Sequence, residues 1–594
     1  MIKNIQFVAF FSLSLFIFQN PVFSQVTTPL LPSQVSPGAV IQPSQVQDYK
    51  DPSKLKKKPK QKVEEQEKKE EVKKVKSKTK INLSKIVVLD NTLISPFLID
   101  KVTKKYINRE VDFNDLQELT LELSALYRDK GYVTSRVYLP PQRVENGLLT
   151  LQSSEGIIKP ITLQEGKYYK SKSIFPRLRI DQNEHLNINK IKSDLARINE
   201  NPDVGLQAVL KPGKETGTTE VLLQTKDRLP IHFSPFFDNL GRDLIGNERF
   251  GFGITHNNLL GFGDTNVTSL NWTKESFGVS NNYEMPIGKY GTKVGFNYAH
   301  SRLELGKQFA PLNVEGFATI YTPYISQEIY RGKHLQANAD LALDFKNLGT
   351  DILGTRFSRD RLRIIRPGLN VDEFDKYGRT FLRNELAFGV DPFNETNKYS
   401  PINSRAGSGD GFFRYTVFGT RITQLPHGIQ HILRGTGQFS DDLLNSAEQM
   451  QVGGAFTVRG YKEGQLIGDS GFVLSQELRV PTYIFPRSWK FPMTRDGIPA
   501  IFSKKGKKQP LYDYVFRDNI QVVGFTDFGG AFVNPNKLIG VPGSDNFAIG
   551  VGSGLRVRLT RFLVGRVDVG VPLIRNLPER HDLFVHFGLQ SEPF

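Results

Sequence analysis

The fold of this chain is decided by the stretch Phe250-Gly251-Phe252-Gly253-Ile254-Thr255, in which large apolar residues alternate with small or polar ones. The same alternation returns at residues 293–298, where Val294, Phe296 and Tyr298 are the apolar members. Successive side chains of a β-strand point to opposite faces, so each of these strands would have one apolar and one polar face. In a transmembrane barrel the apolar face meets lipid and the polar face meets the lumen. The pattern therefore predicts an all-β transmembrane barrel.

Strands of this kind recur throughout residues 229–594. A strand that crosses a membrane needs about 9 to 11 residues, and turn signals separate segments of that length. The segments begin near residues 231, 248, 264, 277, 291, 315, 333, 358, 380, 411, 428, 471, 518, 548, 561 and 582. We therefore expect about 16 antiparallel strands in residues 229–594.

The composition agrees with a β-rich membrane protein. Phe and Tyr, which favour strands, number 43 and 20, and Cys is absent. The absence of Cys excludes a disulfide scaffold, a thiolate metal site and a cysteine nucleophile. The net charge of +17 is concentrated, because residues 54–80 alone contribute +8. The rest is spread thinly, as on a surface that faces anionic lipid headgroups or an acidic ligand, and we expect outer-membrane lipid as a partner and no nucleic acid.

The first 80 residues contain a targeting segment and a polar spacer. Lys3 precedes an apolar run at residues 7–18, and Val22-Phe23-Ser24 provides a cleavage site, which predicts a signal peptide in residues 1–24. No later apolar run is long enough to be a transmembrane helix, which again favours a barrel. Residues 25–80 are Pro-rich and then Lys/Glu-rich. Such compositions bury too little apolar surface to fold, so we expect a disordered linker.

A small α/β unit is predicted in residues 81–156. A short apolar strand at 85–89 opens it, and Asp112 begins an amphipathic helix whose leucines lie on one face. Strands at 132–139 and 148–153 close the unit.

A second unit, in residues 157–228, repeats the order strand, helix, helix, strand, strand. Its clearest element is a helix at 188–198, which Asn187 should cap. Small sheets of this sort have exposed edges, to which an extended polypeptide can add as a further strand. Binding by β-augmentation is therefore expected of these units.

These units resemble a known pair of domains. The runs 131–142 (GYVTSRVYLPPQ) and 147–151 (GLLTL) resemble the first polypeptide-transport-associated (POTRA) domain of the two-partner secretion (TpsB) transporters, the family of ShlB and FhaC. The second unit resembles its partner domain through residues 186–199 and 210–213. Asp238-Asn239 and residues 257–264 resemble the first barrel hairpin and turn of that family. The resemblance implies a 16-strand outer-membrane barrel with both POTRA domains in the periplasm.

Two further motifs carry the same resemblance. Val458-Arg459-Gly460-Tyr461 resembles the motif at the tip of the family's sixth extracellular loop, which folds back into the lumen. Phe525-Thr526-Asp527-Phe528-Gly529 resembles the Phe-x-Asp-x-Gly motif on the inner barrel wall. The resemblance implies that Arg459 pairs with Asp527.

The residues themselves make this pairing plausible. Phe525, Asp527 and Gly529 share one face of a strand, and a carboxylate is costly on the lipid face, so Asp527 should point into the lumen. An arginine such as Arg459 can bind it through two hydrogen bonds. Glu477, on the strand after the loop, is a second candidate carboxylate, with a solvated lumen residue as the alternative interpretation.

Catalytic patterns are not found. The chain has no Gly-x-Ser-x-Gly elbow, no His-Glu-x-x-His and no phosphate-binding Gly-x-x-x-x-Gly-Lys-Ser/Thr. We therefore expect no enzyme activity, no catalytic residue, no metal and no cofactor. One departure from the family pattern is a long insertion at residues 486–516, which carries Lys504, Lys505, Lys507 and Lys508 and should lie in the periplasm.

The function implied by the resemblance is secretion. The POTRA domains would recognise an unfolded exoprotein, and the barrel pore would pass it outward; the implied partner is a large secreted β-helical protein with an N-terminal secretion domain. One alternative is a BamA-type outer-membrane protein assembly factor, although such factors usually carry more than two POTRA domains. A second alternative is a passive porin.

Overall fold

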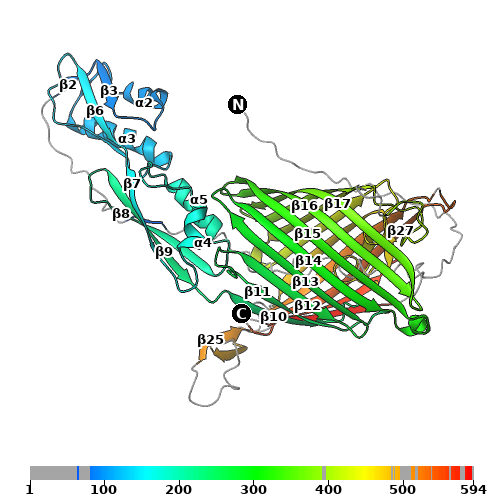
Figure 1. The fold of residues 1–594 in the computed structure, drawn as a ribbon. Helices are drawn as coiled ribbons and strands as arrows, with labels where there is room; N and C mark the ends of the chain where they lie inside the picture. The colour runs from blue at the N-terminus through cyan, green and yellow to red at the C-terminus, as the bar shows by residue number, and fades with distance from the viewer. Residues whose placement is uncertain are drawn as a thin grey trace, which may run out of the picture.

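The computed structural model describes residues 63–65, 80–390, 396–482, 486, 488–494, 510–515, 519–536, 538–560, 563–574 and 582–591. The predicted signal peptide, most of the predicted linker and Lys504, Lys505, Lys507 and Lys508 of the insertion lie outside these residues. Within them, two small α/β modules stand at one end of a closed β-barrel (Figure 1). None of the described helices is long and apolar enough to cross a membrane.

The first module is a three-stranded sheet covered by two helices. Its elements are β2 (Ile81–Asn82), β3 (Lys85–Leu89), α2 (Pro96–Thr103), β4 (Glu110–Val111), α3 (Phe113–Asp129), β5 (Arg136–Tyr138) and β6 (Leu148–Ser154). The sheet order is β3-β6-β5. The start of α3 is fixed by a capping box, in which Asp112 accepts from the Asp115 N–H at 2.9 Å and Asp115 accepts from the Asp112 N–H at 2.8 Å. The leucine face of α3 is buried against the sheet, as its periodicity predicts.

The second module is built on the same plan. Its elements are β7 (Ile157–Gln164), α4 (Ser171–Ile174), the 3-10 turn η4 (Phe175–Arg177), α5 (Ile188–Ile198), β8 (Val204–Pro212) and β9 (Thr218–Asp227). Asn187 caps α5 by accepting from the Asn189 and Lys190 N–H groups. The sheet order is β1-β8-β9-β7.

Strand β1 (Val63–Glu65) comes from the range predicted as a linker. It pairs in parallel with residues 208–210 of β8. The open edge of β8 presents unpaired N–H and C=O groups, which an extended segment satisfies. A short part of the spacer therefore adds to the sheet, a pairing that its composition does not reveal.

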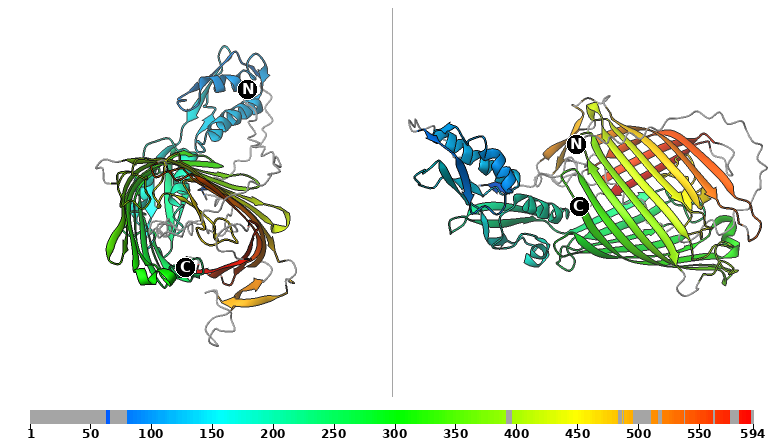
Figure 2. Two further views of the ribbon diagram at one scale, coloured as in Figure 1. Left: turned by 90° about the vertical axis from the view of Figure 1, so that its right-hand side faces the viewer. Right: turned by 90° about the horizontal axis from the view of Figure 1, so that it is seen from above.

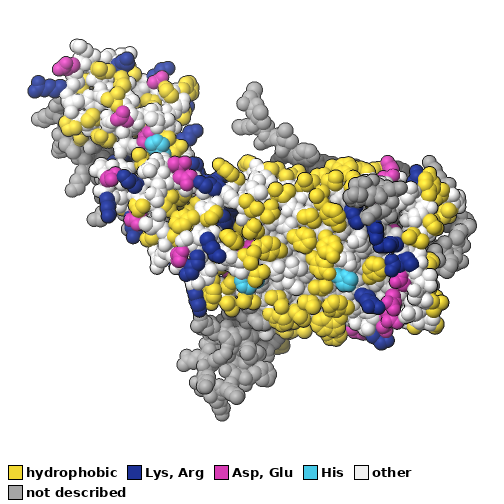
Figure 3. Space-filling model, viewed as in Figure 1, with side chains coloured by type: hydrophobic (Ala, Val, Ile, Leu, Met, Phe, Trp, Pro, Cys, Tyr) yellow, Lys and Arg dark blue, Asp and Glu magenta, His cyan; other side chains and the backbone are white. Residues whose placement is uncertain are grey.

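The barrel closes through sixteen of the described strands in sequence order. They are β10 (Ile231–Asp238), β11 (Arg249–His256), β12 (Thr265–Trp272), β13 (Ser276–Ile287), β14 (Thr292–Glu304), β15 (Val314–Arg331), β16 (Leu335–Ile352), β17 (Thr355–Phe374), β18 (Gly378–Val390), β19 (Phe413–Gln424), β20 (Gln430–Phe439), β23 (Ser470–Pro481), β26 (Ile520–Val533), β27 (Ser544–Arg558), β28 (Leu563–Pro572) and β29 (Phe584–Ser591). The prediction of about 16 antiparallel strands is confirmed, and each predicted start lies within four residues of the observed one. On the face drawn in Figure 3, apolar side chains cover much of the middle of the barrel wall.

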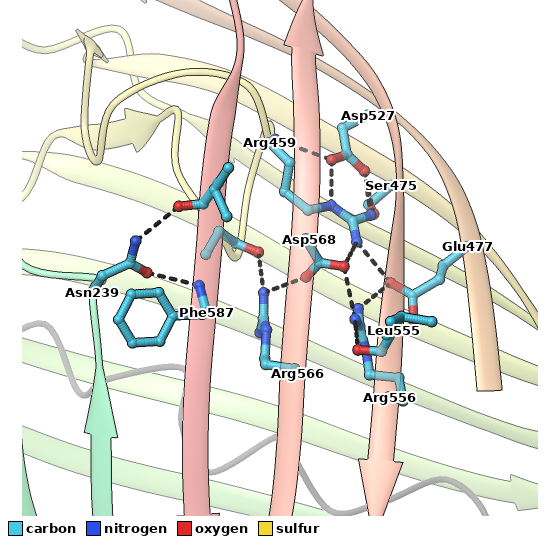
Figure 4. A network of polar contacts seen from close by, with 12 residues as sticks. Asn239, Arg459, Ser475, Glu477, Asp527, Leu555, Arg556, Arg566, Asp568 and Phe587 are labelled. Atoms are coloured by element: carbon cyan, nitrogen blue, oxygen red, sulfur yellow. Dashed lines mark hydrogen bonds and ion pairs between the residues drawn. The ribbon is translucent and has the colours of Figure 1, made fainter. Parts of the chain in front are cut away.

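The barrel is sealed where β10 meets β29. Only three residue pairs are in register there, from Phe236 with Gln590 to Asp238 with Gly588. Asn239 extends this seam, because its side chain donates to the Val585 carbonyl at 2.8 Å and accepts from the Phe587 N–H at 2.8 Å (Figure 4).

Strand direction assigns each connection to one end of the barrel. Since β10 leaves the second module, the loops after β18, β20 and β26 all open at the far end, away from the modules. The connection from β23 to β26 is at the module end. It contains the hairpin β24 (Lys490–Thr494) and β25 (Pro510–Val515), so the insertion lies on the side predicted for it (Figure 1).

A buried carboxylate joins the second module to the barrel. Asp203 is fully buried and accepts from Arg228 Nε at 2.6 Å and from Asn257 Nδ2 at 2.7 Å, and it contacts His232 Nε2 at 2.8 Å. Nearby, Arg197 Nη2 donates to Glu328 of β15 at 2.7 Å. Only residues 228–230 connect β9 to β10, so these contacts and this short linker hold the module against the barrel rim.

We expect Asp203→Ala to release the module from the rim. Without this carboxylate the buried side chains of Asn257 and His232 each lose a hydrogen-bond partner, and a buried polar group left unsatisfied typically costs about 1 to 3 kcal/mol. Limited proteolysis should cut the variant at residues 228–230 faster than the parent protein. The matched control is Asp181→Ala, because Asp181 pairs with Lys289 across the same boundary but both side chains are exposed. Equal cleavage of the two variants would contradict a locked module.

Candidate functional site in the barrel lumen

The connection from β20 to β23 folds back into the barrel. Two short strands, β21 (Met450–Val452) and β22 (Leu466–Gly468), pair with each other within it and pack against the barrel wall at β26. Between them, residues 453–465 form a turn that carries the predicted loop motif. Viewed along the barrel axis, this connection lies inside the ring of strands (Figure 2). We call residues 440–469 the lumen loop.

The glycine of the loop motif is required by how closely the loop approaches the wall. Gly460 has φ +97°, a region that side chains disfavour. A Cβ there would lie 2.9 Å from the Val571 carbonyl carbon and 3.0 Å from the Pro572 nitrogen, both backbone atoms of β28. On the wall, a Cβ at Gly550 would lie 1.9 Å from the Arg459 carbonyl oxygen. The backbones therefore touch without intervening side chains.

Arg459 reaches from this turn to the inner wall, where it is 3% exposed. It binds Asp527 through two hydrogen bonds, from Nε to Oδ2 at 2.7 Å and from Nη2 to Oδ1 at 2.8 Å. The Arg459 backbone N–H also donates to Asp527 at 3.0 Å. Ser475 of β23 contributes a hydroxyl that donates to Asp527 at 2.6 Å. The structure thus brings together the two residues that the motifs imply (Figure 4).

The other members of the inner-wall motif make room for the loop. The Phe525 ring lies under the Arg459 guanidinium, with its centroid 3.5 Å from Cζ, a cation–π contact. A Cβ at Gly529 would lie 2.6 Å from Val452 and 2.8 Å from Val458 of the loop. On one face of β26, Phe525 therefore provides the ring on which the guanidinium lies, Asp527 the negative charge, and Gly529 the space for the loop side chains.

The flanking loop residues also have defined contacts. Val458 is fully buried in an apolar cluster that joins β21, β22 and the wall. The Tyr461 hydroxyl lies 3.1 Å from the carbonyl oxygens of Ile549 and Ile574, between which its single proton is shared, and it accepts from the N–H groups of the same two residues at 3.2 Å. Tyr461 thereby attaches the loop to β27 and to the residues that follow β28.

Glu477 lies in the same cluster and is 2% exposed. It accepts from Arg459 Nη1 at 2.8 Å, from Arg479 Nε at 2.6 Å and from Arg556 Nη2 at 3.2 Å. Its surroundings differ from those of a solvated lumen residue. A solvated lumen residue would not have three guanidinium groups around a buried carboxylate.

Asp568 of β28 completes the network. It is fully buried and accepts from Arg556 Nη1 at 2.7 Å and from Arg566 Nη2 at 3.0 Å. Sequence reasoning missed Arg479, Arg556, Arg566 and Asp568. A signal for some of them exists, because Ser475, Glu477 and Arg479 alternate with apolar residues along β23 and so share its lumen face.

The arrangement of these charges can hold a loop against the barrel wall. Four guanidinium groups and three carboxylates alternate in a buried layer, and Arg459 is the charged side chain that the loop contributes to it. Within the described residues, no group of three or more His, Asp and Glu could hold a metal ion. The chemistry is that of an ionic clamp between the lumen loop and strands β23, β26, β27 and β28.

Two family profiles match the chain. The profile "Haemolysin secretion/activation protein ShlB/FhaC/HecB" matches residues 217–494, and "POTRA domain, ShlB-type" matches residues 81–156. Together they span more than half of the chain.

Individual relatives agree with these profiles. The chain is 24% identical over 426 residues to the heme/hemopexin transporter protein HuxB of Haemophilus influenzae, covering 70% of this chain and 74% of HuxB. It is 25% identical over 403 residues to the outer membrane transporter CdiB of Dickeya dadantii, covering 65% and 70%.

Solved structures share the fold. CdiB from Escherichia coli matches with a TM-score of 0.67 and 19% identity over 88% of this chain and 92% of CdiB. BamA from Haemophilus ducreyi lacking POTRA domains 1–3 matches with a TM-score of 0.50 and 12% identity, covering 87% and 100%. The motifs, the barrel, the POTRA modules and the profiles agree: the chain belongs to the ShlB/FhaC/HecB family of outer-membrane two-partner secretion transporters, with its POTRA domains in the periplasm.

Proposed function

We propose that this protein captures one unfolded exoprotein in the periplasm through its POTRA modules and secretes it through the barrel when the lumen loop moves. The observation that carries the proposal is the clamp itself. A loop of the chain occupies the lumen, and its Arg459 lies among carboxylates of the wall strands β23 and β26. A passage that must open only for a substrate needs such a releasable obstruction.

The periplasmic modules offer the capture surface. Their sheets end at β3 and β5 in the first module and at β7 in the second, and no further strand of the described residues pairs with these edges. An extended chain can add to an edge of this kind through backbone hydrogen bonds, which do not depend on its sequence. This property suits a substrate that arrives unfolded.

The exoprotein is proposed to be a large secreted β-helical protein with an N-terminal secretion domain, as the family resemblance implies. The relatives named above are transporters, and so is the hemolysin transporter protein HpmB of Proteus mirabilis, to which the chain is 24% identical over 404 residues. Since a carrier of this sort needs no bond-making chemistry, we propose that the protein is not an enzyme.

The clamp argues against a passive porin. A porin keeps a water-filled lumen open, whereas here the lumen loop crosses it. The BamA-type alternative shares the barrel fold, and fold alone does not separate the two functions. The distinction therefore depends on what is lost when the protein is absent.

We expect Arg459→Ala to reduce exoprotein secretion while the barrel still assembles. The substitution leaves Asp527 and Glu477 buried with fewer cations, which typically costs about 3 to 5 kcal/mol. Secreted exoprotein is measured in the medium, and assembly by the heat-modifiable mobility of the barrel. Arg459→Lys should recover only part of the secretion, because an ammonium lacks the planar fork that binds Asp527.

The matched control is Arg302→Ala. Arg302 also pairs with a carboxylate on the barrel, Glu315, but both side chains are exposed. An exposed pair contributes little, so secretion should stay at the parent level. If Arg459→Ala also secretes at that level, the clamp has no role in transport.

Deleting the gene tests the function as a whole. We expect one large exoprotein to disappear from the medium while the abundance of other outer-membrane barrels stays normal. A joint fall of many barrels would instead support the BamA-type assembly factor. Unchanged secretion and unchanged barrels, together with reduced uptake of small solutes, would support the porin.

A further inference from the structure

The first half of the lumen loop packs against the wall opposite the Arg459 clamp. Leu444 is fully buried among Leu362, Ile364, Ala387 and Phe412, which belong to β17, β18 and the residue before β19. Ala447 packs on Ala318 of β15 and Leu348 of β16. The loop is therefore attached to β15–β19 by one half and to β23–β28 by the other, and it spans the lumen from wall to wall.

This first half has its own ionic contacts. Glu448 is 1% exposed and pairs with Lys346 of β16 and with Arg414 of β19, whose Nη1 lies 2.7 Å from it. None of these residues touches the Arg459 network.

A second buried carboxylate, that of Asp469, contacts residues of three interstrand loops at the outer end of the barrel. Asp469, the last residue of the lumen loop, is fully buried and pairs with both Nη atoms of Arg405, which belongs to the β18–β19 connection. It also accepts from the Leu444 N–H at 3.0 Å, from Gln449 Nε2 at 3.3 Å and from the Asn534 N–H at 2.8 Å. Asn534 follows β26, so the contacts join three loops that emerge from different hairpins.

Arg405 is the one charged donor in this set, and it also donates to the Leu444 carbonyl at 3.1 Å. The other donors to Asp469 are two backbone N–H groups and an amide. Two of those donors, like Asp469 itself, belong to the lumen loop, whereas Arg405 belongs to a different loop. Loss of Arg405 would therefore remove the charged link between the two loops and leave the local contacts of Asp469 in place.

We propose that Arg405 and Asp469 are positioning residues for secretion, a mouth clamp that holds the first half of the lumen loop across the barrel. Its release opens the extracellular mouth, and this step is separate from the Arg459 clamp. The two clamps share no residue and lie on different segments of the loop. An exoprotein must displace both, because the loop is attached to both walls. The secretion part of this inference rests on the proposed function, while the effect on the closed pore does not.

The first experiment measures the pore without any exoprotein. The purified full chain carrying Arg405→Gln is placed in planar lipid bilayers, and its mean ion conductance should rise several-fold over the parent protein. Arg405→Lys retains the charge and should give an intermediate conductance. The control is Arg356→Gln, since Arg356 pairs with Asp351 at the same end of the barrel and both side chains are partly exposed. Equal conductance of Arg405→Gln and Arg356→Gln would overturn the mouth clamp.

The second experiment holds the mouth closed with a disulfide, whereas the first weakens the mouth clamp. The chain has no Cys, so a single engineered disulfide can be formed without competition. Ser404 Oγ lies 3.4 Å from the Ser446 backbone nitrogen, and the two residues belong to the β18–β19 connection and the lumen loop. Ser404→Cys combined with Ser446→Cys should secrete exoprotein under reducing conditions and lose most of that secretion when oxidised.

The two readouts distinguish the possible failures. Heat-modifiable mobility confirms that each variant has assembled, so a misfolded protein is not scored. An oxidised double variant that secretes at the reduced rate would overturn the need for mouth opening. If the parent protein secretes nothing, the proposed function fails, and the conductance comparison still decides whether Arg405 keeps the pore closed.

Discussion

A guanidinium group is costly to bury inside a barrel unless carboxylates lie beside it. The position of the lumen loop depends on how this requirement is met at Arg459. Its two hydrogen bonds to Asp527 and its contact with Glu477 place the loop motif at one depth and against one sector of the wall. Burying either charge alone would cost several kcal/mol. The pairing therefore determines where the loop must lie, while the apolar contacts around it determine how tightly it is packed.

The wall is shaped to receive the loop. Glycines at 529, 550 and 570 lack the side chains that would separate the wall backbone from the loop backbone. Gly460 of the loop likewise has no side chain on the facing surface. Close backbone approach brings the Arg459 N–H, as well as its side chain, within reach of Asp527. Small residues and charged residues thus act together, because the ionic contacts form only where the glycines allow the approach.

The contacts divide the molecule into parts that are fixed and a part that can move. At the periplasmic end, Asp203 and a three-residue linker hold the second module on the rim. At the outer end, the lumen loop is attached through ionic contacts to two opposite walls. Ionic contacts of this kind are exchangeable for water or for a polar substrate, whereas the continuous ladder of barrel strands is not. Transport is therefore physically based on a rigid barrel wall around a lumen loop whose ionic contacts can be exchanged.

The sequence by itself determined the barrel, the approximate start of every strand and the two α/β modules. These properties depend on local periodicity and on caps such as Asp112 and Asn187, which short segments specify without the rest of the chain. It also indicated that Asp527 faces the lumen, because the lipid face excludes a carboxylate. What only the tertiary structure decided is which lumen-facing charges meet. The contact of Arg556 with both Glu477 and Asp568 depends on the register across the four strands β23, β26, β27 and β28. Register is set by pairing between distant segments, and a shift by one residue would turn each of these side chains to the lipid.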